Sequence, residues 1–164
     1  RDIVHVTGSL KRNVYADRLK GYRQALLAHG LPYREDRVIV NDLSDEAAVA
    51  AGQQILNMEP RPDGLFAAQD LCAAICMRTL RAGGVQIPRD IAVAGFNNDV
   101  ISTVVEPTLT TIDYPGREIG ETAARHLIGQ LKKGPKNNLT NKIVLASRLI
   151  VRNSSLRKPG KNDG

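Results

Sequence analysis

The chain has 164 residues, 42% of them hydrophobic and 24% charged, a composition that fits one globular domain with a single main core. No apolar run approaches the roughly 18 residues of a membrane-spanning helix, so a membrane-embedded class is excluded. The net charge of +6 comes from the end of the chain: residues 1–131 carry 14 basic and 16 acidic side chains, and residues 132–164 carry nine and one. No aromatic residues that could stack on bases are interleaved with this basic end, so solvated loops are favoured over a nucleic-acid surface.

Strand and helix patterns alternate along the first two thirds of the chain. Short apolar runs of strand type are separated by single helices with apolar residues every three or four positions. This alternation predicts parallel strand pairing through right-handed crossovers, and hence a doubly wound α/β fold. Strands are expected at residues 3–7, 38–40, 64–68 and 91–95, and helices at residues 14–29 and 70–82. A further helix is expected between them, capped by Ser44 or Asp45 and with an apolar stripe that reaches Met58.

The last third of the chain is organised differently. An extended run at residues 109–112 precedes a helix that opens at Pro115 and carries an apolar stripe. A basic loop then leads to a final strand, expected at residues 142–151. The stripe consists of Ile119, Ala123, Leu127 and Leu131.

Polar side chains follow several of the predicted parallel strands. The stretch VAGFNND passes directly from an apolar strand to Asn97, Asn98 and Asp99. In open α/β sheets, ligands bind beyond the carboxyl ends of the strands. Residues 7–12, 68–70 and 96–99 are therefore expected to face one crevice.

Four segments resemble the ligand-binding half of the LacI/GalR family of transcription regulators. In chain order they read DRLKGYRQAL, DGLFAAQDLCAA, IPRDIAVAGFNND and EPTLTTIDYPGREIGETAARHL, and the resemblance runs from residue 3 to about residue 152. It implies a periplasmic-binding-protein-like fold of type I, in which two lobes close on a small effector. It also implies an N-terminal helix-turn-helix domain that binds operator DNA, which this chain does not contain.

The resemblance divides the chain between the two lobes. Residues 1–111 are expected to form the C-terminal lobe, and residues 112–135 to belong to the N-terminal lobe. Residues 136–152 are expected to return as a strand of the C-terminal lobe, and residues 153–164 to form a disordered tail. On this basis the chain, which opens on Arg1 inside a strand pattern, is expected to be a piece of a longer protein.

The resemblance also implies effector contacts, which we weigh against structural roles. Arg18 matches an arginine that donates to effector oxygens, whereas an isolated helix arginine is usually solvated. Phe66 could stack on a sugar face or pack in the core. Gln69 is a possible pocket amide, and Asp70 could bind the effector, although capping of the following helix is favoured.

The residues after the fourth strand carry the main departure from the family pattern. Asn97 stands where many relatives have an aspartate, so the effector class is open between sugars and purines. A turn role for Asn97, Asn98 and Asp99 is the alternative. Tyr114, at the crossing between lobes, and Arg12, in the first loop, are further candidates.

One predicted helix has no polar face at its start. The run LCAAICM, residues 71–77, is apolar all round and must be covered on two sides. Burial inside the monomer is one interpretation. The other is a homodimer interface, as the family implies, formed by Leu71, Ala74, Ile75, Val104 and Val105.

Enzyme, metal and cofactor interpretations are not favoured. His5, His29 and His126 have no metal-binding spacing, and TGSLKRN matches neither a dinucleotide-binding nor a P-loop motif. Cys72 and Cys76 share one helix face and are poorly placed for a disulfide, which indicates a reducing cytoplasm.

The sequence therefore predicts the effector-sensing domain of a transcription regulator that acts as a homodimer. A periplasmic sugar-binding protein of a transport system is the main alternative, and a nucleotide-using α/β enzyme a distant third.

Overall fold

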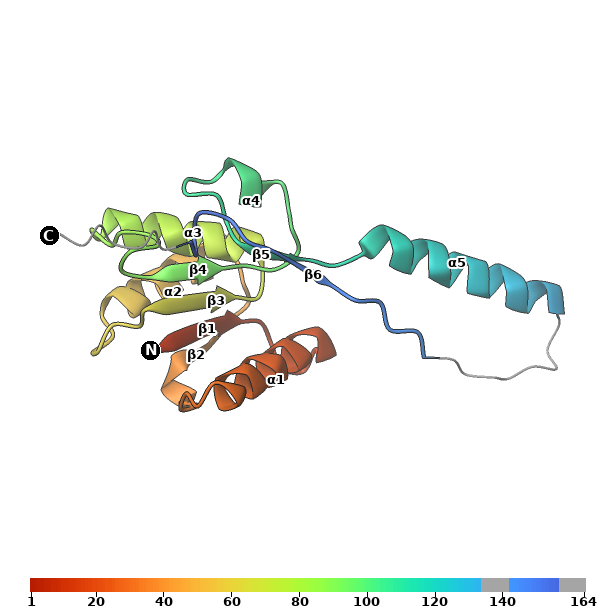
Figure 1. Ribbon diagram of the computed structural model, residues 1–164, viewed down its shortest axis with the longest axis horizontal. Helices are drawn as coiled ribbons and strands as arrows, with labels where there is room; N and C mark the ends of the chain where they lie inside the picture. Colours follow the sequence, from red (N-terminus) through yellow and green to blue (C-terminus); the bar gives the residue numbers. More distant parts are fainter. Residues whose placement is uncertain (134–141, 157–164) are drawn as a thin grey trace, which may run out of the picture.

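A computed structural model describes residues 1–133 and 142–156. Its centre is a four-stranded parallel sheet in the order β2-β1-β3-β4, with α2 and α3 on one face and α1 on the other (Figure 1). The predicted doubly wound α/β class is confirmed. The strands of this sheet are β1 (Ile3–Thr7), β2 (Val38–Val40), β3 (Gly64–Ala67) and β4 (Ala92–Ala94), and the helices around it are α1 (Asn13–Ala28), α2 (Asp45–Leu56) and α3 (Asp70–Ala82).

The core lies between the sheet and the helix pair α2 and α3. Val4, Val6 and Val93 point from the sheet into this layer and are fully buried, as are Ile55 of α2 and Leu80 of α3. Complete burial of side chains of this size stabilises the fold by about 1.5–3 kcal/mol each. This packing fixes the strands as a rigid platform for the loops at their carboxyl ends.

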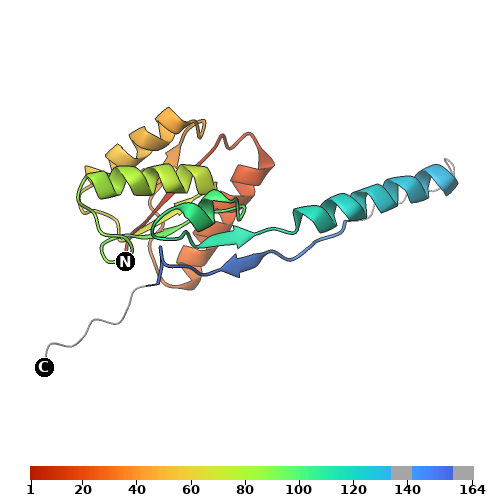
Figure 2. The same ribbon diagram turned by 90° about the horizontal axis from the view of Figure 1, so that it is seen from above.

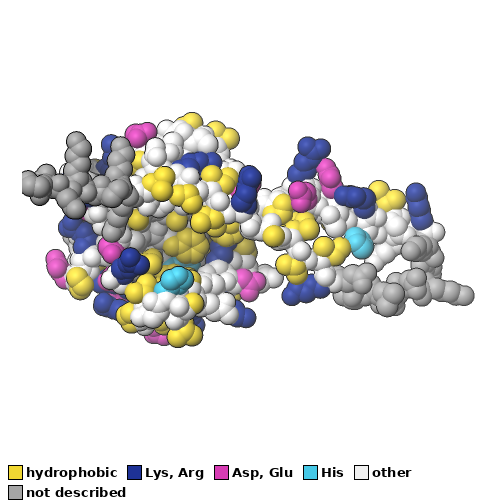
Figure 3. Space-filling view, in the orientation of Figure 1, with side chains coloured by type: hydrophobic (Ala, Val, Ile, Leu, Met, Phe, Trp, Pro, Cys, Tyr) yellow, Lys and Arg dark blue, Asp and Glu magenta, His cyan; other side chains and the backbone are white. Residues whose placement is uncertain are grey.

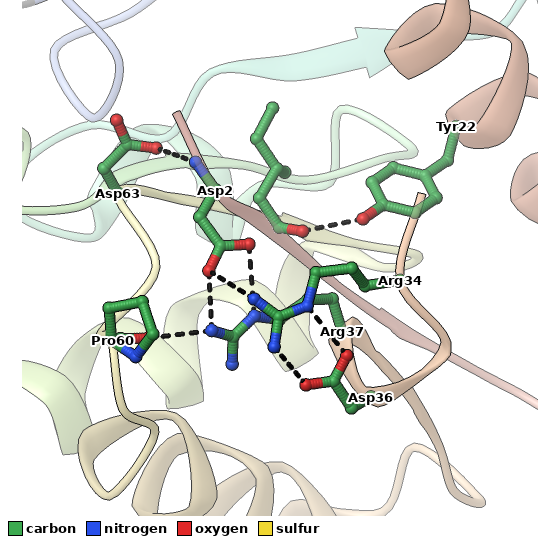
Figure 4. A network of polar contacts seen from close by, with 8 residues as sticks. Asp2, Tyr22, Arg34, Asp36, Arg37, Pro60 and Asp63 are labelled. Atoms are coloured by element: carbon green, nitrogen blue, oxygen red, sulfur yellow. Dashed lines mark hydrogen bonds and ion pairs between the residues drawn. The ribbon is translucent and has the colours of Figure 1, made fainter. Parts of the chain in front are cut away.

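The amino-terminal edge of the sheet is closed by a polar cluster (Figure 4). A short 3₁₀ helix, η1 (Glu35–Arg37), places Arg37 in the interior, where it is 3% exposed. Its guanidinium group lies 2.6 Å from the Asp2 carboxylate and donates to the carbonyl oxygen of Pro60 at 2.8 Å. Beside it, the Tyr22 hydroxyl donates to the Ile3 carbonyl oxygen at 2.6 Å, which ties α1 to β1.

The last third of the chain leaves the body. A short helix, α4 (Ile101–Val104), follows β4, and β5 (Thr111–Asp113) then pairs antiparallel with β6 (Arg148–Ile150) in a separate two-stranded ribbon. Between these two strands, α5 (Gly116–Lys133) projects away from the sheet and its helices (Figures 1 and 2).

Two expectations about the end of the chain are wrong. The final strand comprises three residues rather than residues 142–151, because β5 offers only three residues to pair with it. The tail does not begin at residue 153, because Ser154 is fully buried. Its backbone nitrogen donates to Thr108 O, and its hydroxyl donates to Val93 O at 2.6 Å and accepts from Thr110 N at 2.8 Å. Most of the expected tail, residues 157–164, lies outside the described residues.

Candidate functional site

The carboxyl ends of β1, β3 and β4 lie at the same edge of the sheet. The parallel registers pair Val6 with Ala67 and Phe66 with Ala94, so the three strands end almost level. The loops that follow them are residues 8–12, 68–69 and 95–99. The structure therefore places the three predicted loops beside one another.

Arg18 of α1 lies over the loop that follows β4. Its guanidinium carbon is 3.7 Å from the centre of the Phe96 ring, and one of its N–H groups donates to the carbonyl oxygen of Ala68. Burial lowers the pKa of Arg18 below its ordinary value, while the nearby hydroxyl groups of Tyr15 and Tyr114 and the carboxylate of Asp70 oppose this effect. The fixed guanidinium fork suits recognition of a ligand with several oxygen atoms.

Two aromatic residues of this site were missed by the sequence analysis. Phe96 provides the face on which Arg18 stacks, and its position between a strand end and three polar residues is the signal that could have identified it. Tyr15 is the other, because its hydroxyl accepts a hydrogen bond from Gln69 at 3.1 Å and its ring lies 6.0 Å from the Arg18 guanidinium. Gly8 is needed beside this ring, since a Cβ atom at that position would overlap it.

Asn97 and Asn98 take backbone conformations that most residues avoid. Their φ angles are 120° and 57°, and the value for Asn98 lies in the left-handed region, which asparagine tolerates better than other residues with a Cβ atom. The side-chain nitrogen of Asn97 donates to the Asp99 carboxylate at 3.3 Å, as the turn interpretation suggests. In the chain, Asn97 directly follows Phe96, the residue on whose ring Arg18 stacks. Arg18 and Asn97 therefore belong to the same edge of the molecule.

Asp70 does not have the helix-capping role that was favoured for it. It is fully buried as the first residue of α3, whose N-cap is Gln69, and its side chain does not cap the helix. Its carboxylate accepts a hydrogen bond from the Thr111 hydroxyl at 2.6 Å and one from the Asp99 backbone at 2.8 Å. Burial raises the pKa of Asp70, and these hydrogen bonds oppose the rise. Asp70 thus supports the loop that follows β4 through these two hydrogen bonds.

The remaining candidates are spread around the site. Phe66 is half-buried and stacks on His5, with ring centres 4.7 Å apart, so it takes part in the cluster beneath α1 as the core interpretation expects. Tyr114 is 44% exposed where β5 leaves the body, close enough to influence the ionisation of Arg18. Arg12 is exposed at the start of α1.

A second feature is a groove of about 680 Å³ between α3 and α4. Its floor is formed by Ala74 and Ile75, which are nearly buried, while Leu71 and Val104 are 47% and 67% exposed on its walls. The opposite face of α3, with Cys72, Cys76 and Met77, is buried in the core, so Leu71 is the one residue of the apolar run that the described part of the chain leaves exposed. All five residues expected at a dimer interface line this groove: Leu71, Ala74, Ile75, Val104 and Val105.

The described residues contain no group of three or more side chains that could hold a metal ion. Within the same ranges, no helix has the length and apolar character required to cross a membrane.

Comparison with known proteins identifies the family to which the chain belongs. A periplasmic binding protein-like domain family matches residues 1–155. The chain is 34% identical over 154 residues to the HTH-type transcriptional regulator CelR of Thermobifida fusca, covering 94% of this chain and 45% of the relative. It is 31% identical to the HTH-type transcriptional repressor PurR of Photobacterium profundum, covering 91% and 44%. The chain thus spans less than half the length of these relatives.

Solved structures give the same result. A transcriptional regulator CelR–cellobiose complex matches with a TM-score of 0.87 at 34% identity, covering 94% of this chain and 47% of that one. The transcription regulator CcpA of Lactococcus lactis matches with a TM-score of 0.83 at 26% identity, covering 94% and 56%. The chain belongs to the periplasmic binding protein-like domain family, and within that family it is similar to part of transcription regulators such as CelR, PurR and CcpA.

Proposed function

We propose that this chain senses a small effector, a sugar or sugar derivative, in a cleft between two lobes and thereby modulates operator binding by a LacI-type regulator. The observation that carries the proposal is the Arg18 guanidinium, held on the Phe96 ring beside Asn97 at the carboxyl edge of the sheet. Planar donors next to an amide suit vicinal hydroxyl groups, and a solved relative is described as a complex with cellobiose. A purine is the second effector class, since an amide and a guanidinium can also pair with a purine edge.

The projecting helix supports a cleft between lobes. On α5, Ile119, Leu127 and Leu131 are 46%, 59% and 75% exposed, so the described part of the chain leaves much of the predicted apolar stripe uncovered. Figure 3 shows hydrophobic side chains gathered on this projecting part of the molecule. We assign residues 112–135 to a first lobe whose remainder lies outside this chain. The cleft would then lie between that lobe and the edge that carries Arg18.

Regulation would follow from population shift. An effector that binds the closed lobes better than the open ones stabilises closure by about 1.4 kcal/mol for each tenfold preference. Closure would change how the DNA-binding heads of the two subunits are placed relative to each other. These heads are not part of this chain. We place the regulator in the cytoplasm. A periplasmic sugar-binding protein remains the alternative, and the sequence upstream of residue 1 in the gene separates the two, because the regulator predicts a helix-turn-helix there and the binding protein predicts an export leader.

The test is effector binding by the full-length protein. Thermal-shift screening with mono- and disaccharides, cellobiose among them, and with purine bases identifies a binder, and calorimetry then measures its affinity. Arg18→Ala should weaken binding by about 10- to 100-fold, since hydrogen bonds from a charged group contribute about 1.5–3 kcal/mol. Arg23→Ala is the matched control, because Arg23 of α1 also stacks on an aromatic ring, with its guanidinium carbon 4.3 Å from the centre of the Tyr33 ring, but away from the site. Equal affinities of Arg18→Ala and wild type would remove Arg18 from the site and contradict the proposal.

The groove between α3 and α4 supports a homodimer. Val104→Asp places a charge on its apolar wall and should convert the dimer to a monomer in analytical ultracentrifugation. Val100→Asp is the control, because Val100 is 78% exposed near the same short helix and does not line the groove. A dimer that survives Val104→Asp at micromolar protein would place the interface elsewhere.

A further inference from the structure

The loop that carries Asn97 continues β4 alongside β5. An isolated parallel bridge joins Ala94 to Thr110, and the Gly95 backbone nitrogen donates to Thr110 O at 2.8 Å. The Asn97 backbone nitrogen then donates to Ile112 O at 3.0 Å. The position of Asn97 is therefore set by β5, which is one of the two strands that connect the body to α5 (Figure 1).

Asn98 links this loop to both connecting strands. Its backbone nitrogen donates to the Thr111 hydroxyl at 3.2 Å, and its side-chain nitrogen donates to the Asp113 carboxylate at 3.3 Å, both on β5. Its side-chain oxygen accepts a hydrogen bond at 2.9 Å from Arg152, which lies just beyond β6. The left-handed backbone of Asn98 lets one side chain reach both partners.

Arg152 holds the other side of this link. Its guanidinium group donates to the Ser102 hydroxyl at 3.1 Å and to Leu109 O at 2.8 Å, as well as to Asn98. No ion pair to Arg152 is found within residues 1–133 and 142–156, so these neutral oxygen atoms stabilise its charge. Loss of the Asn98 oxygen therefore removes one of the acceptors that fix the Arg152 side chain.

The two connecting strands are also joined at this point. Asp113 and Arg148 face each other in the β5–β6 register, and their side chains are 3.3 Å apart. Asp113 therefore binds Asn98 of the loop and Arg148 of β6 at once. Movement of the ribbon toward or away from the body must break or carry along the loop that holds Asn97.

We infer that Asn98 and Arg152 are positioning residues that fix the Asn97 loop to the β5–β6 ribbon, so that ribbon movement and effector binding are coupled. Neither residue contacts the effector. The affinity part of this inference rests on the proposed function, whereas the link between loop and ribbon can be measured in the protein without effector.

Amide hydrogen exchange of the full-length, effector-free protein tests the link. Asn98→Gly removes the side chain while still permitting the left-handed backbone, so the fold is not strained. We expect exchange of the Asn97 and Asp99 amides to accelerate at least about tenfold, with Arg152→Met producing a similar change. Asn57→Gly, at the end of α2, is the matched control and should leave these amides at their wild-type rates.

Effector affinity provides the second readout. With a sugar that binds the wild type, Asn98→Gly and Arg152→Met should each weaken binding about tenfold. The double variant should have the same affinity as the single variant that binds less tightly, because the two substitutions break the same link. Wild-type exchange at Asn97 and Asp99 in Asn98→Gly would overturn the positioning role. Additive losses of affinity in the double variant would overturn the shared link. A wild type that binds no sugar or purine would instead overturn the proposed function, and the exchange result would still decide the positioning role.

Discussion

His5 is a buried histidine whose protonation the fold opposes. Its ring stacks between Phe66 and Tyr22, at 4.7 and 5.2 Å between ring centres, and its Nδ1 atom lies 2.9 Å from Phe66 O. Its Nε2 atom is buried without a hydrogen-bond partner among the described residues. Burial lowers the pKa of His5 to about 4, the hydrogen bond to Phe66 opposes this, and the Arg18 charge lowers it further.

The resulting pH dependence has a defined sign and size. The unfolded chain takes up the His5 proton near pH 6.5, and the folded protein only near pH 4, so the unfolded state binds more protons between these values. The contribution of neutral His5 to the free energy of unfolding is therefore fully present above pH 6.5, and it is lost progressively as the pH falls to about 4. At about 1.4 kcal/mol per tenfold change in proton affinity, the loss is about 3 kcal/mol.

Urea unfolding of the wild type and of His5→Phe across this pH range measures the effect. Phenylalanine keeps a ring between Phe66 and Tyr22 and cannot take up a proton, while both proteins retain His29 and His126. The free energy of unfolding should fall by about 3 kcal/mol more in the wild type than in His5→Phe. Parallel pH profiles, within about 0.5 kcal/mol, would refute the assignment of His5 as a buried neutral group.

Two further pairs of substitutions, each a test with its control, probe the packing around the sheet. Asp2→Ala leaves Arg37 buried without its carboxylate and should lower the free energy of unfolding by about 2–4 kcal/mol in urea titrations, whereas Arg34→Ala, an exposed neighbour, should have a much smaller effect. A loss below about 1 kcal/mol for Asp2→Ala would show that solvent replaces the ion pair. Gly95→Ala places a Cβ atom onto the Asp70 carboxylate and should destabilise by about 1–3 kcal/mol, while Gly21→Ala in α1, where a Cβ atom meets nothing, should stabilise by about 0.5–1 kcal/mol. Equal stability of the two glycine variants would contradict the close approach at Gly95.

The local pattern of the sequence determined the fold class and most element positions. The helix predicted at residues 70–82 has those bounds in the structure, because a polar N-terminus precedes an apolar run that two glycines end. The strands at residues 3–7 and 38–40 also agree, because short β-branched runs bounded by polar or glycine residues leave few alternatives. The meeting of the loops after β1, β3 and β4 followed from the rule that parallel strands deliver their loops to one edge, whereas Arg18 was expected there only from the family resemblance.

Contacts between distant segments were decided by the tertiary structure alone. Nothing local distinguishes Asp70 as a buried support from Asp70 as a helix cap, since its partners Asp99 and Thr111 lie 29 and 41 residues away. Burial of Ser154 likewise depends on Val93, 61 residues earlier. Hydropathy periodicity is a property of neighbouring residues and so specifies elements. Hydrogen bonds across the chain depend on how those elements pack, and only the packed chain specifies which polar side chains meet.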